Sequence, residues 1–261
     1  MNDEFVLHNG DCLEIMKEIG DKSIDFILCD LPYGTTNSKW DSIIPLEPLW
    51  EQYERIIKDD GAIALFSQQP FTSILCCSNL KLFRYEWIWE KEYGTGFLNA
   101  NKMPMKAHEN ILIFYKKLPT YNPIMRTVIE PQHKYRKTSE MQKRNTEKSI
   151  YGKTGITMIV ENDAGTMKRF PVDILNYRKE RENVHPSQKP LKLCEYFIKT
   201  YTNAGDLVLD NCMGSGTTGI ACAYNGRKFI GIEKDEHYFR VANDRVTRAY
   251  KERIPDELFE S

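Results

Sequence analysis

The chain has 261 residues, of which 28% are charged and 41% are hydrophobic, and its formal net charge is −1. This length suits one large domain, or one domain that carries an inserted subdomain, and the composition is ordinary for a globular protein. No stretch approaches the roughly 20 apolar residues of a membrane span, and the first residues lack the pattern of a signal peptide. We therefore expect a cytoplasmic protein with no membrane partner.

The cysteines and histidines do not form a metal-binding pattern. None of the seven cysteines has a partner at C-x-x-C spacing, and none of the five histidines belongs to an H-E-x-x-H pattern. The number of cysteines is odd, and several lie in apolar stretches. We therefore expect reduced, buried thiols and no metal site.

Strands and helices alternate along the first 115 residues. Apolar runs predict strands at 5–11, 25–30, 61–66, 83–89 and 111–115, and apolar residues at helical spacing predict helices at 12–19, 46–57 and 70–78. Residues 94–101 are expected to form a polar loop. The segment 34–44 is also polar, and its Trp40 is a candidate either to stack against a substrate or to anchor a lid.

The first candidate site directly follows the strand at 25–30. The run Phe26-Ile27-Leu28-Cys29 is continuously apolar, which is typical of a buried parallel strand, and open α/β sheets bind ligands at the carboxyl ends of such strands. The next residues are Asp30, Leu31, Pro32 and Tyr33. The proline biases the residue before it toward an extended backbone, so a carboxylate, a free carbonyl and a ring gather together. This set suits a flat group that bears an amine, although Asp and Pro are also common in plain turns.

The middle of the chain has a different character. From 118 to 183 the regular periods fade, so we expect an inserted recognition lobe with little regular structure between two halves of one domain, 1–117 and 184–261. Within the insert, the segment 126–153 has an excess of basic residues, which suits either a polyanionic partner or a solvated loop. The candidates for nucleic-acid contact in it are Lys134, Arg136, Lys137, Lys143 and Arg144.

A second candidate site lies in the C-terminal part, where strands are predicted at 206–210 and 228–233 and helices at 191–202, after the turn 211–219, and at 236–251. In that turn Gly214, Gly216 and Gly219 match the dinucleotide-binding fingerprint, and Glu233 ends the next strand. Glycines let a ligand approach the backbone, and a carboxylate at this place can accept both ribose hydroxyls. We expect a nucleoside-containing cofactor, with NAD and S-adenosylmethionine both open.

Four short segments follow one another in an order that is typical of one enzyme class. They are Asn9-Gly10-Asp11-Cys12, Asp30-Leu31-Pro32-Tyr33, His185-Pro186-Ser187-Gln188-Lys189-Pro190, and Asp210 with Gly214-Ser215-Gly216-Thr217-Thr218. Together they resemble the circularly permuted beta class of S-adenosylmethionine-dependent DNA amino-methyltransferases. In that class an Asp-Pro-Pro-Tyr motif comes first, target recognition lies in the middle, and the cofactor glycines come last.

The resemblance implies a fold and a set of roles. The fold would be a Rossmann-like, doubly wound, mostly parallel seven-stranded sheet, the class I methyltransferase fold in permuted form, with an inserted target-recognition lobe. Asp30 and the Leu31 carbonyl would accept the two N–H bonds of the N6 amine of an adenine flipped out of DNA, with Tyr33 stacked on the base. The residues implied for S-adenosylmethionine are Asp11, Cys12, Asp30, Lys189, Asp210, Gly214, Ser215, Gly216, Thr217, Thr218 and Glu233.

Within that set the resemblance gives three residues separate partners on the cofactor: Asp11 the adenine, Glu233 the ribose and Lys189 the methionine carboxylate. Two residues depart from the class. Leu31 stands in place of the first proline, and Cys212 stands where the class usually has Phe, which predicts looser packing near the cofactor.

Several alternatives stay open. The target could be the N4 amine of cytosine or an RNA base, although an Asp at the first motif position favours adenine over the Ser typical of the cytosine group. An NAD-dependent oxidoreductase would keep the glycine turn and give Asp30 an acid or base role. A homodimer and a cognate restriction endonuclease are further partners that the sequence leaves open.

Overall fold

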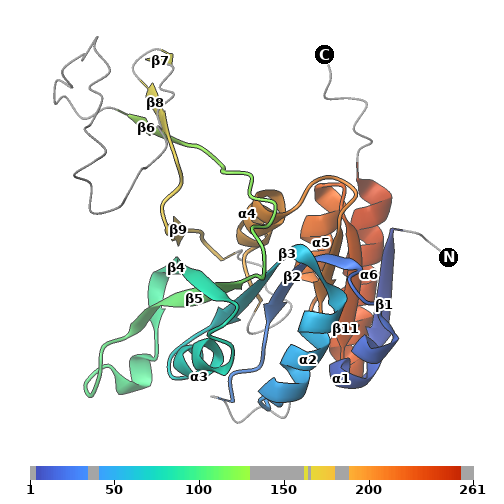
Figure 1. Ribbon diagram of the computed structural model, residues 1–261. Helices are drawn as coiled ribbons and strands as arrows, with labels where there is room; N and C mark the ends of the chain where they lie inside the picture. Colours follow the sequence, from blue (N-terminus) through green and yellow to red (C-terminus); the bar gives the residue numbers. More distant parts are fainter. Residues whose placement is uncertain (1–3, 35–40, 130–161, 164–165, 180–187, 254–261) are drawn as a thin grey trace. The chain divides into compact units, whose positions relative to one another are not determined.

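The computed structural model describes residues 4–34, 41–129, 162–163, 166–179 and 188–253 (Figure 1). The chain divides into two compact units, one formed by 1–122 together with 172–261 and the other by 123–171. The larger unit carries all four segments that the resemblance rests on. The predicted insert, 118–183, is wider than the smaller unit, because residues on both sides of that unit are part of the larger one.

The larger unit is built on an eight-stranded sheet with the order β1-β11-β10-β2-β3-β5-β4-β9. The first five strands in this order run parallel, β5 is antiparallel to both of its neighbours, and β9 is parallel to β4. The bounds are β1 (Phe5–Asn9), β2 (Ile24–Asp30), β3 (Ile57–Ser67), β4 (Phe83–Thr95), β5 (Lys106–Phe114), β9 (Ile174–Asn176), β10 (Leu207–Asp210) and β11 (Lys228–Glu233).

The predicted α/β class with a mostly parallel sheet is confirmed, but the predicted number of seven strands is wrong. The eighth strand is β9, in which Leu175 is buried beside Trp89 of β4. The indole N–H of Trp89 also donates to the Tyr177 carbonyl at 2.8 Å. Three residues are too few to show a period in the sequence, so this strand could not be recognised there.

Helices cover both faces of this sheet, because alternate side chains of a strand point to opposite faces. On one face Ile27 and Cys29 of β2 belong to a buried cluster with Tyr53 of α2. On the other face the Phe26 ring stacks on Tyr201 of α4 at 5.3 Å. The helices are α1 (Cys12–Ile15), η1 (Met16–Glu18), α2 (Leu46–Ile56), α3 (Phe71–Ser78), η2 (Phe97–Asn99), α4 (Leu191–Tyr201), α5 (Thr217–Tyr224) and α6 (Glu236–Glu252).

One difference from the predicted elements lies at the end of β4. The strand β4 extends to Thr95, which pairs with Lys106 of β5, so the first two residues of the predicted polar loop 94–101 belong to this strand and the others lie in the connection of a long hairpin. Its polar and charged residues hide the alternation that would have marked a strand. The helices of the described ranges include none that is both long and apolar enough to span a membrane.

The chain leaves and re-enters the larger unit at two fixed points. Before the insert, the Asn122 amide N–H donates to the Thr200 carbonyl at 2.7 Å, and its side chain donates to the carbonyls of Lys199 and Thr202. After the insert, β9 pairs with β4, and the Ile88 N–H donates to the Asp173 carbonyl at 2.7 Å. The larger unit therefore binds both ends of the inserted segment.

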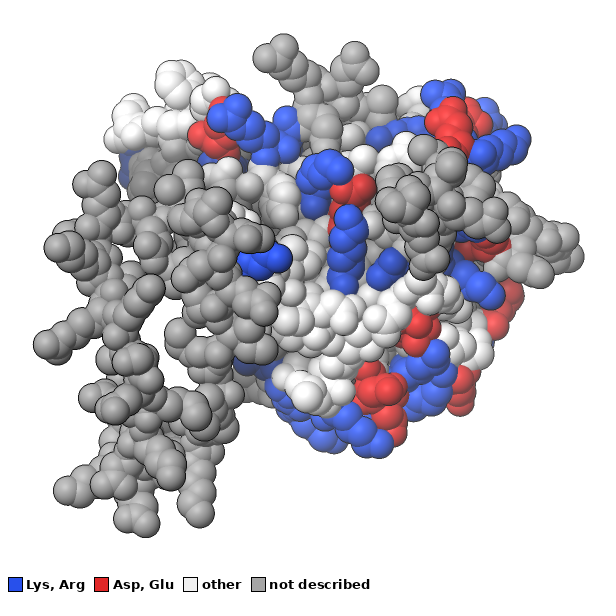
Figure 2. All heavy atoms as spheres, turned by 90° about the horizontal axis from the view of Figure 1, so that it is seen from above, with Lys and Arg blue, Asp and Glu red and all other residues white. Residues whose placement is uncertain are grey.

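The smaller unit contains a three-stranded antiparallel sheet with the order β6-β8-β7. The bounds are β6 (Arg126–Ile129), β7 (Asn162–Asp163) and β8 (Thr166–Arg169). The five basic residues predicted to contact nucleic acid fall in 130–161, outside the described residues. Over the described surface seen from above, Lys and Arg side chains are interspersed with Asp and Glu (Figure 2).

Candidate active site

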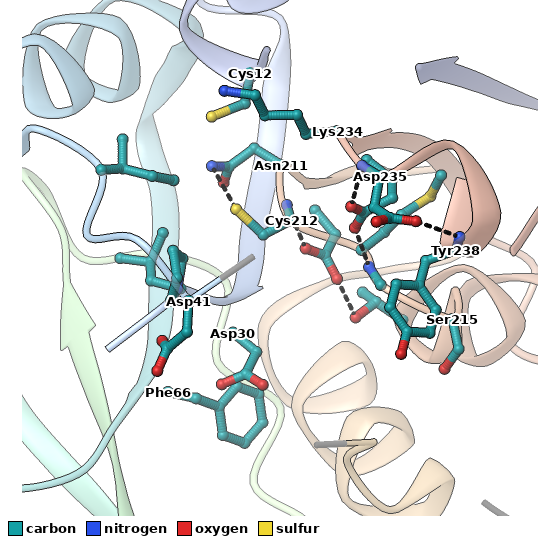
Figure 3. A pocket seen from close by; sticks show the side chains of 18 of the residues that line it. Cys12, Asp30, Asp41, Phe66, Asn211, Cys212, Ser215, Lys234, Asp235 and Tyr238 are labelled. Atoms are coloured by element: carbon teal, nitrogen blue, oxygen red, sulfur yellow. Dashed lines mark hydrogen bonds between the residues drawn. The ribbon is translucent and has the colours of Figure 1, made fainter. Parts of the chain in front are cut away.

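The carboxyl ends of β2, β10 and β11 open onto one cavity of about 640 Å³. It lies in the larger unit and is lined both by Asp30 to Tyr33 and by the turn that follows β10. The two sequence motifs therefore face a shared space, although Asp30 and Asp210 are 180 positions apart in the sequence. Figure 3 shows Asp30 and Phe66 on one side of this space and Ser215, Asp235 and Tyr238 on the other.

The first wall of the cavity is centred on Asp30, the last residue of β2. The Tyr33 hydroxyl donates to Asp30 Oδ1 at 2.7 Å, and Lys189 Nζ lies 2.5 Å from Oδ2. The Tyr33 ring stacks on Phe71 of α3, with centroids 5.5 Å apart. Both oxygens of the carboxylate thus have side-chain partners, and Tyr33 is held at both its hydroxyl and its ring.

Burial and charge act against each other at this wall. Burial raises the pKa of the Asp30 carboxyl, and the neighbouring ammonium of Lys189 counteracts that rise. For Lys189 burial lowers the pKa, but the negative charges of Asp30 and Glu109 outweigh burial and raise it. Lys189 therefore stays protonated, and it binds Asp30 as a buried cation.

The second wall begins with the turn after β10. Asp210 Oδ1 accepts the Cys212 N–H at 3.1 Å, and Oδ2 accepts the Thr218 hydroxyl at 2.7 Å. Burial raises the pKa of Asp210 to about 7, although both hydrogen bonds oppose that rise. Asp210 thereby ties the strand, the turn and the first residues of α5 together.

Glu233 joins the end of β11 to the same turn. Its Oε2 accepts the Gly214 N–H and its Oε1 accepts the Asp235 N–H, each at 2.8 Å. Burial raises the pKa of this carboxyl, and the backbone donors oppose the rise. The carboxylate is therefore held at the cavity edge by two main-chain groups.

Two glycines of the turn after β10 have different roles. Gly214 has φ +50°, and a Cβ added there would meet nothing within 4 Å. Gly216 has φ +80° and is the N-cap residue of α5, where a Cβ would lie 2.9 Å from Val246. Gly214 thus keeps the cavity open, whereas Gly216 allows α5 and α6 to pack closely.

One polar side-chain atom in the second wall lacks a hydrogen-bond partner. Among the described residues, Thr217 Oγ1 is buried and forms no hydrogen bond. A buried hydroxyl without a partner is costly, and it lies in a wall that also presents Glu233 and the open side of Gly214. A ligand with both donor and acceptor groups, such as a nucleoside with an amino-acid tail, fits this set of groups.

Asp11 and Cys12 line the cavity from the turn after β1. Asp11 Oδ1 accepts the Leu13 N–H at 3.0 Å and caps α1, and Oδ2 lies 3.0 Å from Lys234 Nζ. Cys12 is buried. Asp11 therefore has the capping role that is common for Asp at a helix start, and its position on the cavity leaves a ligand role open as well.

The cavity contains most of the predicted site residues. Of those predicted for catalysis or the cofactor, only Gly216 is not in its lining. Trp40 lies in 35–40, outside the described residues. Lys189 also lines the cavity, and its ammonium pairs with Asp30 on the first wall.

Sequence reasoning missed several lining residues, among them Asp41, Phe66 and Glu109. Asp41 Oδ1 accepts the Gly34 N–H at 2.8 Å. Phe66 ends the apolar run of the strand predicted at 61–66, so nothing in the sequence distinguishes it from a core residue. Glu109 lies two residues before the strand predicted at 111–115, where one charged residue gives no signal of burial.

Comparison with known proteins gives the family of this chain. A sequence model of a family described as DNA methylase matches residues 24–244. The Type II methyltransferase M1.MboII of Moraxella bovis is 29% identical over 257 residues, which cover 91% of this chain and 94% of that protein. The DNA adenine methyltransferase YhdJ of Escherichia coli (strain K12) is 26% identical over 257 residues, covering 94% of this chain and 83% of that protein.

Solved structures show the same fold. The M1.HpyAVI–SAM complex superposes with a TM-score of 0.63 at 23% identity, covering 92% of this chain and 99% of that one. The PvuII DNA methyltransferase (cytosine-N4-specific) superposes with a TM-score of 0.65 at 16% identity, covering 95% of this chain and 92% of that one. The fold of the larger unit is that of the class I methyltransferases.

Proposed function

This chain belongs to the DNA methylase family, and from that premise we propose that it transfers a methyl group from S-adenosylmethionine to the exocyclic N6 amine of an adenine in DNA. Because methyl transfer needs a methyl donor, the family favours S-adenosylmethionine over the NAD that the glycine spacing alone left open. The order of the chain, with β2 before β10, supports the permuted beta class.

The observation that carries the proposal is the shared cavity. Asp30 to Tyr33 and the glycine turn line one space of about 640 Å³, which is a size typical of ligand and cofactor sites. A base and a cofactor that enter this space would meet between the two walls. Had the two motifs faced different sides of the sheet, no single transfer reaction could have used both.

On the first wall we propose that Asp30 and the Leu31 carbonyl accept the two N–H bonds of the target amine. The lone pair of an exocyclic amine is delocalised into the base, so the amine is a weak nucleophile. Two acceptors placed beside it draw the nitrogen toward tetrahedral geometry and orient the lone pair. The structure offers a partly buried carboxylate for this task, directly preceding Leu31 in the cavity wall.

On the second wall we propose that Glu233 accepts the ribose hydroxyls of the cofactor and that Asp11 contacts its adenine. The unpartnered Thr217 hydroxyl and the open face of Gly214 support a ligand at this place. When bound, S-adenosylmethionine supplies an activated methyl group. Lys189, implied for the methionine carboxylate, donates to Asp30 instead, and we propose that it acts on that residue.

An amine inside a duplex is out of reach, so the target base must leave the stack at a cost of a few kcal/mol. We propose that Tyr33 receives the extruded base on the ring face that does not contact Phe71. Trp40 and the basic residues Lys134, Arg136, Lys137, Lys143 and Arg144 stay proposed DNA contacts. A homodimer and a cognate restriction endonuclease also stay predictions.

Two observations bear on the choice of base. The acidic residue at the start of the motif and the similarity to an adenine methyltransferase favour adenine. The structural similarity to a cytosine-N4 enzyme makes that base the alternative. The test is to incubate unmethylated bacterial DNA with the purified protein and the methyl donor, and then to separate the nucleosides by mass spectrometry. We expect N6-methyldeoxyadenosine, whereas N4-methyldeoxycytidine would overturn the adenine assignment.

A further inference from the structure

Four charged side chains form a connected row at the first wall. Lys189 Nζ lies 2.5 Å from Asp30 Oδ2 and 3.3 Å from Glu109 Oε2. The other oxygen of Glu109, Oε1, lies 2.6 Å from Lys91 Nζ. The side chains of Lys91, Glu109 and Lys189 are only 9–10% exposed. Charges so far from water act on one another more strongly than surface ion pairs do.

The Lys189 ammonium and the target amine compete for the Asp30 carboxylate. Its Oδ2 receives the ammonium of Lys189 at 2.5 Å, a charge-assisted hydrogen bond that is stronger than a bond from a neutral amine. A base amine that needs the same carboxylate must therefore share it with a cation. Asp30 accepts the amine more readily if the ammonium has a second anion to bind.

Glu109 is placed to be that second anion. Its Oε2 is buried and receives no hydrogen bond from the described residues, although the ammonium is only 3.3 Å away. An ammonium has three N–H donors, so a small rotation or shift can give one of them to this oxygen. The rings of Phe66 and Tyr33, with centroids 5.2 and 5.8 Å from Lys189 Nζ, flank the ammonium.

We infer that Glu109 is a positioning residue that shares the ammonium of Lys189 and so leaves Asp30 able to accept an N–H of the target amine. The inference rests on the proposed function. Lys91 holds Glu109 from the other side, which orients the unbonded Oε2 toward Lys189. The sheet holds the backbone of Glu109 in place, because Glu109 lies on β5 and pairs with Trp89 of β4.

The test replaces Glu109 by Gln, which keeps the shape and removes the charge. With plasmid DNA and a labelled methyl donor, we expect kcat to fall about 10- to 100-fold, as for a misplaced catalytic group. Cofactor affinity, measured by calorimetry, should stay unchanged, because Glu109 lies on the wall away from the glycine turn.

A second readout separates positioning from mere stability. Burial raises the pKa of Asp30 most, and the negative charge of Glu109 raises it further, so Glu109→Gln should lower the pKa of Asp30. The acidic limb of the kcat/KM profile then moves to lower pH. The same shift is measurable without cofactor or DNA by carbon-13 NMR of aspartate-labelled protein, in which Asp30→Asn identifies the signal.

The matched control is Glu86→Gln on β4. Glu86 accepts the side-chain N–H of Asn110 at 2.8 Å and is not in the cavity lining, so its replacement should leave kcat and the Asp30 titration unchanged. A wild-type rate or an unmoved Asp30 titration in Glu109→Gln would overturn the inference. If the wild-type protein methylates no DNA, the proposed function fails instead, and the NMR titration still decides the coupling.

Should Glu109→Gln fail to fold, Glu109→Asp takes its place. This variant keeps the charge but places it one methylene farther from Lys189, so we expect a reduced kcat with little change in the pKa of Asp30. A wild-type kcat in that variant would contradict the need for a nearby second anion.

Discussion

The two walls of the cavity hold their carboxylates in different ways. Glu233 accepts two backbone N–H groups, and Asp210 accepts one backbone N–H and one hydroxyl. Asp30 instead pairs with the side chains of Lys189 and Tyr33. Backbone donors are fixed by the fold, whereas side chains can change partners. The glycine wall is therefore preformed, and the Asp30 wall can rearrange when a base arrives.

The largest expected effect is on the wall that rearranges. Asp30→Ala removes the only carboxylate proposed to accept the target amine, and we expect methyl transfer to fall by about 1,000-fold or more. Cofactor binding should remain, because the glycine wall does not depend on Asp30. Transfer of a labelled methyl group to DNA measures the first effect and calorimetry the second. A variant that retains activity would place the amine acceptor elsewhere.

The next effect is on the preformed wall. Glu233→Ala removes the acceptor of two backbone donors and of the proposed ribose hydroxyls, so we expect cofactor affinity to fall by roughly 100-fold. DNA binding, measured by fluorescence anisotropy, should change little. Glu233→Gln is the matched control, since it keeps one acceptor oxygen and should lose less affinity. A loss of DNA binding larger than the loss of cofactor binding would move the ribose site away from Glu233.

A smaller effect on kcat is expected when the hydroxyl of Tyr33, one of the two side-chain partners of Asp30, is removed. Tyr33→Phe removes the 2.7 Å hydrogen bond but keeps the ring that stacks on Phe71. One hydrogen bond to a charged group corresponds to about 1.5 kcal/mol, so kcat should fall about tenfold. Tyr33→Ala also removes the ring and should be slower still. Equal rates for the two variants would contradict a role of the ring in receiving the base.

The smallest effect concerns stability and pH on the preformed wall. The pKa of Asp210 is raised by burial from 3.8 to about 7, so between these values the folded protein holds a proton that the unfolded chain has released. The contribution of this group to the free energy of unfolding therefore decreases as pH rises through that window, by about 1.4 kcal/mol per pH unit. Urea denaturation at pH 5 and pH 6 should show a weaker pH dependence for Asp210→Asn. An unchanged dependence would contradict the raised pKa.

The sequence was informative where chemistry depends on contiguous residues. Asp30 to Tyr33 and Gly214 to Thr218 are runs whose residue types and order determine a strand end and a turn, so both could be placed at the carboxyl edge of the sheet. The parallel order of β10, β2 and β3 then brought them to one cavity. Local pattern and general topology rules were sufficient for that step.

Sequence reasoning was insufficient where a contact joins residues from different strands. The hydrogen bond from Lys189 to Asp30 spans 159 positions, and the ion pair of Lys189 with Glu109 depends on the order in which β2, β3 and β5 lie. Neither Glu109 nor β9 has a local pattern that reveals its partner. Pairing across a sheet is a property of the whole fold, so these features became visible only in three dimensions.

The two fastened ends of the insert have a consequence for how such a protein can vary. Asn122 is tied to the end of α4, and β9 is tied to β4, so the chain between them can lengthen, shorten or change its sequence without moving the catalytic groups. We therefore predict that this segment can be exchanged between relatives as a module. Under the proposed function, such an exchange would change the DNA target and leave the methyl-transfer chemistry in place.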